Sequence, residues 1–88
     1  MYSPELDVLD QLQGRDMPLA LVAGLFSDES HAKRAIGAMV QAGDIELLDD
    51  TGTPVPAWRW AEIARQPTIW LAASRYHLHL TDAGAKRA

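Results

Sequence analysis

The sequence predicts a mixed α+β fold, with helices in the first half of the chain and strands mainly in the second. Three observations predict it. Apolar residues recur at helical spacing between residues 29 and 42. An apolar run at 45–48 follows Gly43, and glycine suits a helix end because it takes positive φ at no steric cost. Apolar and polar residues alternate over 76–81, as in a strand with one buried face.

Length and composition indicate one small domain over residues 1–88. Hydrophobic residues make up 48% of the 88 positions, which is enough for a core. The chain has no cysteine, so disulfides and zinc–thiolate sites are excluded. The longest apolar run, near 17–26, is too short to span a bilayer, and the acidic start is unlike a secretory signal. We therefore expect a cytoplasmic protein without a membrane partner.

The net charge of −4 is unlike that of a strong nucleic-acid binder. Its distribution is uneven, because residues 1–30 hold six acidic residues and a single cation, Arg15. The segment 49–88 holds five cations and four acids. Any binding of DNA would therefore depend on a local patch, with modest affinity and salt sensitivity.

The first two helices are predicted from their starts and their apolar residues. Ser3, Pro4 and Glu5 are typical of a helix start. The expected buried stripe of this helix consists of Leu6, Val8, Leu9 and Leu12. A second helix is expected to begin near Pro18 and run toward Phe26. It is so apolar that we expect it to be buried on most sides or to share its outer side with a partner.

The third helix, at about 29–42, is predicted to expose a compact polar face. Asp28 or Ser30 caps it, and the sequence leaves both open. The residues of its apolar stripe are Ala32, Ala35, Ile36, Met39 and Val40. Gly37 is expected on the outward face, where it would permit close approach of a partner or a DNA backbone.

After a strand at 44–48, the segment 49–54 is a strong turn signal. We expect no second strand directly after it. Instead, an inserted segment of about 55–74 should contain a short helix near 58–66. A strand at 76–81 and a short closing helix at 82–87 then complete the predicted fold.

The segments AKRAIGAMVQAGDIELLDD and YHLHLTDAGAKRA together resemble the winged helix-turn-helix superfamily of small bacterial transcription regulators. Ala35, Met39, Gly43 and Ile45 match the passage from recognition helix to first wing strand. Leu80, Thr81 and Gly84 match the leucine-threonine pair and the later glycine that end the second wing strand. The resemblance implies a three-helix core with a two-stranded wing hairpin, here carrying the insertion at 55–74. It covers about 5–50 and 75–88.

The resemblance implies that the protein regulates transcription by binding duplex DNA through the third helix. The expected DNA-binding residues are Ser30, His31, Lys33, Arg34, Gly37 and Gln41. A homodimer is expected, because one such module contacts only one half-site of an operator.

The alternative is a protein–protein interaction module of the same fold that uses the tryptophan-rich insertion. Trp58 and Arg59 are the expected partner-binding residues, with Trp58 more exposed than Trp60. For the cluster of Trp58, Trp60, Trp70 and Tyr76 as a whole, we expect a secondary core that holds the insertion in place, with Trp58 as the exception. The net charge and the acids Asp28 and Glu29 favour this alternative.

No pattern in the sequence indicates an enzyme, a cofactor or a metal site. His77 and His79 share one strand face, as metal ligands can, but the nearby acids have no telling spacing. Paired carboxylates, a nucleophile with its base and a phosphate-binding loop are also not apparent. We therefore expect a binding protein.

Overall fold

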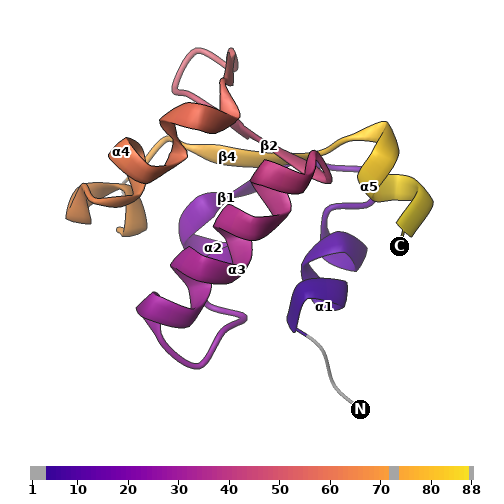
Figure 1. The fold of residues 1–88 in the computed structure, drawn as a ribbon, viewed down its shortest axis with the longest axis horizontal. Helices are drawn as coiled ribbons and strands as arrows, with labels where there is room; N and C mark the ends of the chain where they lie inside the picture. The colour runs from indigo at the N-terminus through magenta and orange to yellow at the C-terminus, as the bar shows by residue number, and fades with distance from the viewer. Residues whose placement is uncertain (1–3, 72–73, 88) are drawn as a thin grey trace.

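The computed structural model describes residues 4–71 and 74–87 and confirms the α+β class (Figure 1). Its helices and strands, with two short 3₁₀ helices labelled η, are α1 (Pro4–Gln11), β1 (Met17–Pro18), α2 (Leu19–Ala23), α3 (Glu29–Ala42), β2 (Ile45–Leu48), β3 (Pro54–Val55), η1 (Ala57–Arg59), α4 (Trp60–Ala64), η2 (Pro67–Trp70), β4 (His77–Leu80) and α5 (Asp82–Arg87).

The four strands form one antiparallel sheet in the order β1-β4-β2-β3. The central pair, β2 and β4, aligns Ile45 with Leu80 and Leu47 with Leu78. In Figure 1, α1, α2 and α3 lie below this sheet, and α4 lies at its upper left. Strand β4 pairs with both β1 and β2, so it brings together segments that are far apart in the sequence.

Two of the strands were not expected from the sequence. Met17 and Pro18 form β1, where a connection and the start of the second helix were predicted. With two residues, this strand is too short for any periodic signal. A second strand does follow the turn at 49–53 directly, contrary to expectation, because Val55 pairs with Leu47. Proline at its first position is tolerated because this strand lies at the edge of the sheet.

The predicted helices are present, with changes at their ends. Helix α3 covers Glu29–Ala42, and α5 covers Asp82–Arg87, as predicted. Helix α2 has only five residues and ends before Gly24, earlier than expected. Leu6 was expected to be buried, but 57% of its surface is exposed on α1.

The core includes the insertion. Ile36, Ile45, Leu47 and Leu78 are almost completely buried, and Ile63 and Ile69 of the insertion are buried to the same degree. Helix α4 contacts α3, and η2 contacts α2. The insertion is therefore a packed part of the domain.

Among the described helices, none is both long and apolar enough to cross a membrane.

Candidate nucleic-acid interface

Helix α3 is held in place at both ends. Asp28 is its N-cap, and its carboxylate accepts a hydrogen bond from the His31 amide at 2.7 Å. This settles the choice between Asp28 and Ser30. Gly43 ends the helix with φ of 83°, as the sequence predicts. The helix therefore enters β2 after a single left-handed residue, which sets its direction relative to the sheet.

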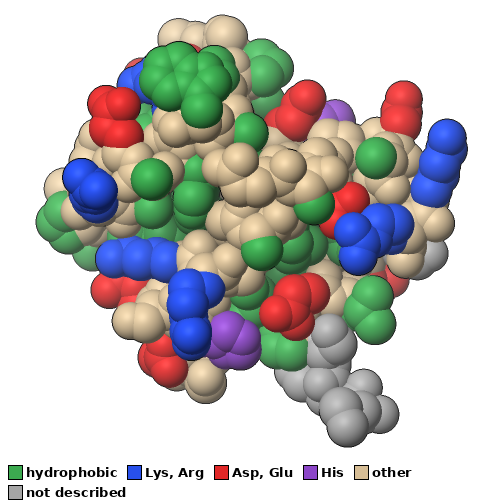
Figure 2. Space-filling view, viewed as in Figure 1, with side chains coloured by type: hydrophobic (Ala, Val, Ile, Leu, Met, Phe, Trp, Pro, Cys, Tyr) green, Lys and Arg blue, Asp and Glu red, His purple; other side chains and the backbone are tan. Residues whose placement is uncertain are grey.

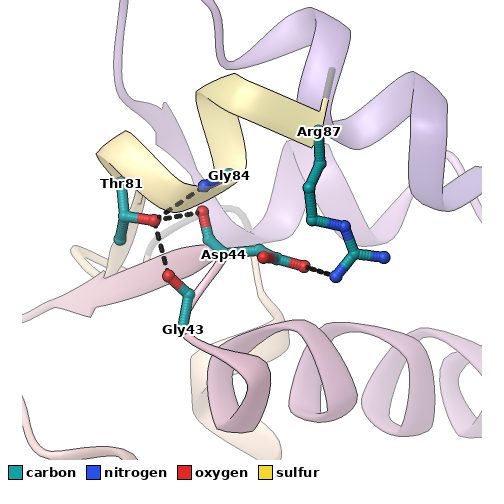
Figure 3. Close-up of polar contacts among 5 residues, drawn as sticks. All are labelled: Gly43, Asp44, Thr81, Gly84 and Arg87. Atoms are coloured by element: carbon teal, nitrogen blue, oxygen red, sulfur yellow. Dashed lines mark hydrogen bonds and ion pairs between the residues drawn. The ribbon is translucent and has the colours of Figure 1, made fainter.

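A second anchor joins α5 to the junction between α3 and β2 (Figure 3). The Thr81 hydroxyl donates to the carbonyls of Gly43 at 2.5 Å and Asp44 at 2.9 Å, and it accepts from the Gly84 amide at 3.1 Å. The buried Asp44 carboxylate pairs with Arg87 at 2.6 Å. A Cβ at position 84 would collide with the Asp44 carbonyl, so glycine is required there.

The polar residues of α3 form one stripe, which we define as Ser30, Arg34, Gly37 and Gln41. Their spacing of three and four residues places them along one line of the helix. The N-terminal half is open, because Ser30 and Arg34 are exposed and Arg34 Nε donates to the Ser30 carbonyl. His31 is half-buried, with its ring edge-on to Phe26. Ser30 and Arg34 are therefore the residues of the stripe most accessible to a ligand.

The insertion packs against the C-terminal half of the stripe, where Gln41 stays exposed. Gly37 is buried, and a Cβ built on it would lie 2.9 Å from Trp60 Cδ1. The prediction that Gly37 faces outward is therefore wrong: its missing side chain makes room for an indole of the same chain. Gln41 Nε2 donates to the Ala57 carbonyl at 2.8 Å, so this amide holds η1 against α3.

Lys33 borders the stripe and also meets the insertion. Its Nζ lies 5.8 Å from the centre of the Trp70 ring, within the range of a cation–π contact. Trp70 is edge-on to Trp60, with ring centres 5.9 Å apart, and its Nε1 donates to the Ala64 carbonyl. These two tryptophans thus form the secondary core that the sequence offered as one explanation of the cluster.

Trp58 is different from the other two tryptophans. Its exposed fraction is 76%, the largest among the exposed large hydrophobic residues of the described chain, as the sequence predicted relative to Trp60. Its neighbour Arg59 is half-buried and lies 3.9 Å from Glu62. The two expected partner-binding residues are thus adjacent and both reach solvent, with 42% of the Arg59 side chain exposed.

The insertion adds cations beside those of α3. Arg59 and Arg65 stand at the two ends of α4. Trp60 of this helix packs over Gly37 of α3. The Ala64 carbonyl accepts a hydrogen bond from Trp70, whose ring lies 5.8 Å from Lys33 Nζ. Figure 2 shows Lys and Arg side chains at the left of the view, over α4 and the N-terminal half of α3, with acidic side chains among them, and further Lys and Arg side chains at the right. Sequence reasoning did not include Arg65, because the contact between α4 and α3 is tertiary and leaves no local pattern.

The turn between β2 and β3 carries a perturbed carboxyl group. The Thr51 hydroxyl donates to the Asp49 carboxylate at 2.6 Å, and the amides of Thr53 and Thr51 donate at 3.0 and 2.9 Å. These bonds, that of the Thr51 side chain first, hold the pKa of Asp49 below its ordinary value. Arg59 adds a smaller effect in the same direction, which places its charge near this turn.

His77 and His79 of β4 make separate contacts. His79 Nδ1 lies 2.6 Å from Asp16 Oδ1, and this contact joins β4 to the segment before β1. His77 Nδ1 lies 2.8 Å from the Arg75 carbonyl. Within the ranges 4–71 and 74–87, no three His, Cys, Asp or Glu side chains cluster as metal ligands.

Comparison with known proteins adds no relative. No protein-family model, no curated protein and no solved structure matches the chain. The structure itself shows a small α+β domain in which α4 contacts α3.

Proposed function

We propose that the chain is a winged-helix domain that binds duplex DNA through the open half of α3 and the cations of α4. The order of its elements supports the winged-helix assignment. A short strand separates α1 from α2, α2 and α3 form a helix-turn-helix pair, and β2 and β4 pair after the insertion. Thr81 and Gly84 belong to the segment that resembles the end of a winged-helix domain. Their hydrogen bonds hold this segment against Gly43, where α3 ends.

One observation carries the DNA-binding proposal. The exposed Arg34 lies beside Lys33 on α3, and α4, which contacts α3, has two more cations at its ends, Arg59 and Arg65. Long cationic side chains contact phosphates, and we propose that the exposed Ser30 and Arg34 contact base edges. The surrounding acids Asp28, Glu29 and Glu62 limit the expected affinity.

A binding assay with charge-matched variants tests this proposal. A fluorescent random duplex library is titrated at about 50 mM salt, where phosphate contacts are strongest. We expect Lys33→Ala with Arg34→Ala to weaken binding at least tenfold. The control is Arg15→Ala with Lys86→Ala, which removes the same charge away from α3. Equal losses for both double variants, or no binding by the wild type, would contradict the proposal.

A second candidate function is favoured by the exposed indole of Trp58. A surface tryptophan is a frequent anchor of protein interfaces, and the net charge of −4 suits a protein partner better than DNA. In this candidate, Trp58 and Arg59 contact the partner. Recovery of a partner by the wild type and its loss in Trp58→Ala, with Leu6→Ala as control, would support it.

The proposed DNA-binding form is a homodimer. Leu21 on α2 and Leu71 after η2 are 60% and 58% exposed, and both elements pack against each other. Burying them against a second copy would remove apolar surface from water. Sedimentation of the wild type and of Leu21→Ser distinguishes a dimer through this surface from a monomer.

A further inference from the structure

Trp58 is an exposed aromatic side chain on a firmly held backbone. It lies in η1, whose Arg59 amide donates to the Pro56 carbonyl at 3.0 Å. The Ala57 carbonyl before it accepts from Gln41 of α3, and Trp60 after it is buried. Little backbone freedom remains to be lost when this indole meets a ligand, so it is preorganised for stacking.

The position of Trp58 relates it to the proposed DNA surface. Gln41 lies seven residues beyond Arg34 on the same stripe, about 10 Å along the helix axis. Neighbouring phosphates of one strand are about 3.4 Å apart along duplex DNA, so this length corresponds to about three nucleotides. Beyond Arg34, Trp60 of α4 packs over Gly37 and Gln41 binds η1, so a strand held at Arg34 would continue over the insertion, where the indole of Trp58 is exposed.

The cations of α4 favour a nucleic acid as the occupant. The indole is followed by Arg59, which also lies 3.9 Å from Glu62, and Arg65 stands at the other end of α4. A stacking aromatic side chain beside cations that follow a backbone is how proteins hold unpaired bases. A tryptophan cannot stack on a base inside an intact duplex unless that base leaves its pair.

We infer that Trp58 stacks on an unpaired base, so that this surface takes DNA with a locally opened segment more tightly than fully paired duplex. The inference rests on the proposed DNA binding and specifies its substrate. Lys33 and Arg34 contact the phosphates of both substrates, and Trp58 contributes only where a base is free. If Trp58 is replaced, we therefore expect the preference for opened DNA to be lost and the binding of paired DNA to be retained.

The experiment compares two labelled DNA probes of equal length, one fully paired and one with a central bubble of three mismatches. Fluorescence anisotropy gives their affinities for the wild type, Trp58→Ala, Trp58→Phe and Lys33→Ala with Arg34→Ala. We expect the wild type to prefer the bubble by about fivefold or more, the lower range for one stacked base. Trp58→Ala should lose this preference, Trp58→Phe should keep part of it, and the cation variant should weaken both probes equally.

The possible results separate this inference from the proposed function. Binding of paired DNA without preference for the bubble would overturn the stacking role and leave the DNA-binding proposal standing. Equal losses on both probes in Trp58→Ala would also overturn it. If neither probe binds, the proposed function fails and the inference with it; self-association that Trp58→Ala abolishes would then identify a protein contact. Thermal unfolding of Trp58→Ala should match the wild type, since the side chain is exposed.

Discussion

At the scale of single residues, glycine matters most where another group occupies the place of its side chain. Gly37 lies within a helix, where alanine is ordinarily favoured by about 1 kcal/mol. Here the methyl group would enter the space of the Trp60 indole, which is 7% exposed and confined by Trp70. Packing therefore decides the sign of this substitution.

We expect Gly37→Ala to lower the free energy of unfolding by about 1–3 kcal/mol, the usual cost of overpacking a core. Urea unfolding followed by tryptophan fluorescence gives the value. In a Trp60→Leu background, the same change should cost much less, because the colliding ring is gone. If Gly37→Ala stabilises both backgrounds, the indole does not occupy this position.

Thr81 is a second residue on which the stability of the fold depends, because its hydroxyl contacts two segments of the chain. Thr81→Val keeps the shape and removes the bonds to the Gly43 and Asp44 carbonyls and to the Gly84 amide. We expect a loss of about 1–3 kcal/mol in the free energy of unfolding, the cost of leaving polar groups unpaired. The control is Thr68→Val on the exposed side of η2, which should change stability by less than about 0.5 kcal/mol.

Asp49 provides a prediction about pH. Its pKa is lowered in the folded state, so this carboxylate contributes stability above its unfolded pKa, and the contribution disappears as pH falls through the folded pKa. Thr51→Ala removes the largest cause and should raise the pKa of Asp49 toward its ordinary value. Titration of the carboxyl carbon by NMR measures it. An unchanged pKa would show that the Thr51 hydroxyl does not bind this carboxylate.

At the scale of elements, the sequence predicts the pieces that carry their own local signals. Helix α3 with its glycine stop, the strand β4 and helix α5 were all predicted, because periodicity and capping residues are local properties. The two-residue strands β1 and β3 were missed. Each is a strand only because β4 or β2 lies beside it, and that depends on tertiary pairing.

The same reason explains how the candidate site was partly mispredicted. Helical spacing placed Gly37 and Gln41 correctly in line with Ser30 and Arg34. It could not show that α4 and η1 lie on that line, since no local pattern records what packs on a helix. The contributions of Trp60 and Arg65 became visible only through this packing.

The insertion also yields a prediction as an element. Trp60→Ala should detach α4 from α3, at a cost of about 3–5 kcal/mol for a buried tryptophan. Hydrogen exchange should then rise first in the segment 57–70, whereas the amides of β2 and β4 should stay protected longer. A uniform rise over the whole chain would mean that the insertion unfolds only with the rest of the domain.

At the scale of the whole molecule, the question is how a protein with a net charge of −4 can hold a polyanion. The proposed surface supplies four cations, Lys33, Arg34, Arg59 and Arg65, of which Arg59 lies near Glu62. Six of the twelve acids lie in residues 1–30, and two of them, Asp28 and Glu29, stand at the start of α3, where they oppose the approach of DNA to Arg34. Acids farther from the surface than a Debye length are largely screened at physiological salt.

These charges set a limit on the salt dependence of binding. Four phosphate contacts release counterions with a slope of about −3.6 in log affinity against log salt, so the affinity should fall by at most about 150-fold between 50 and 200 mM. Arg65→Ala should make the slope shallower by about one contact, or 0.9, while Arg15→Ala should leave it unchanged. A wild-type slope much steeper than −3.6 would require further cations, from outside this surface or from a second copy, and a slope near zero would argue that α3 and α4 contact protein in place of DNA.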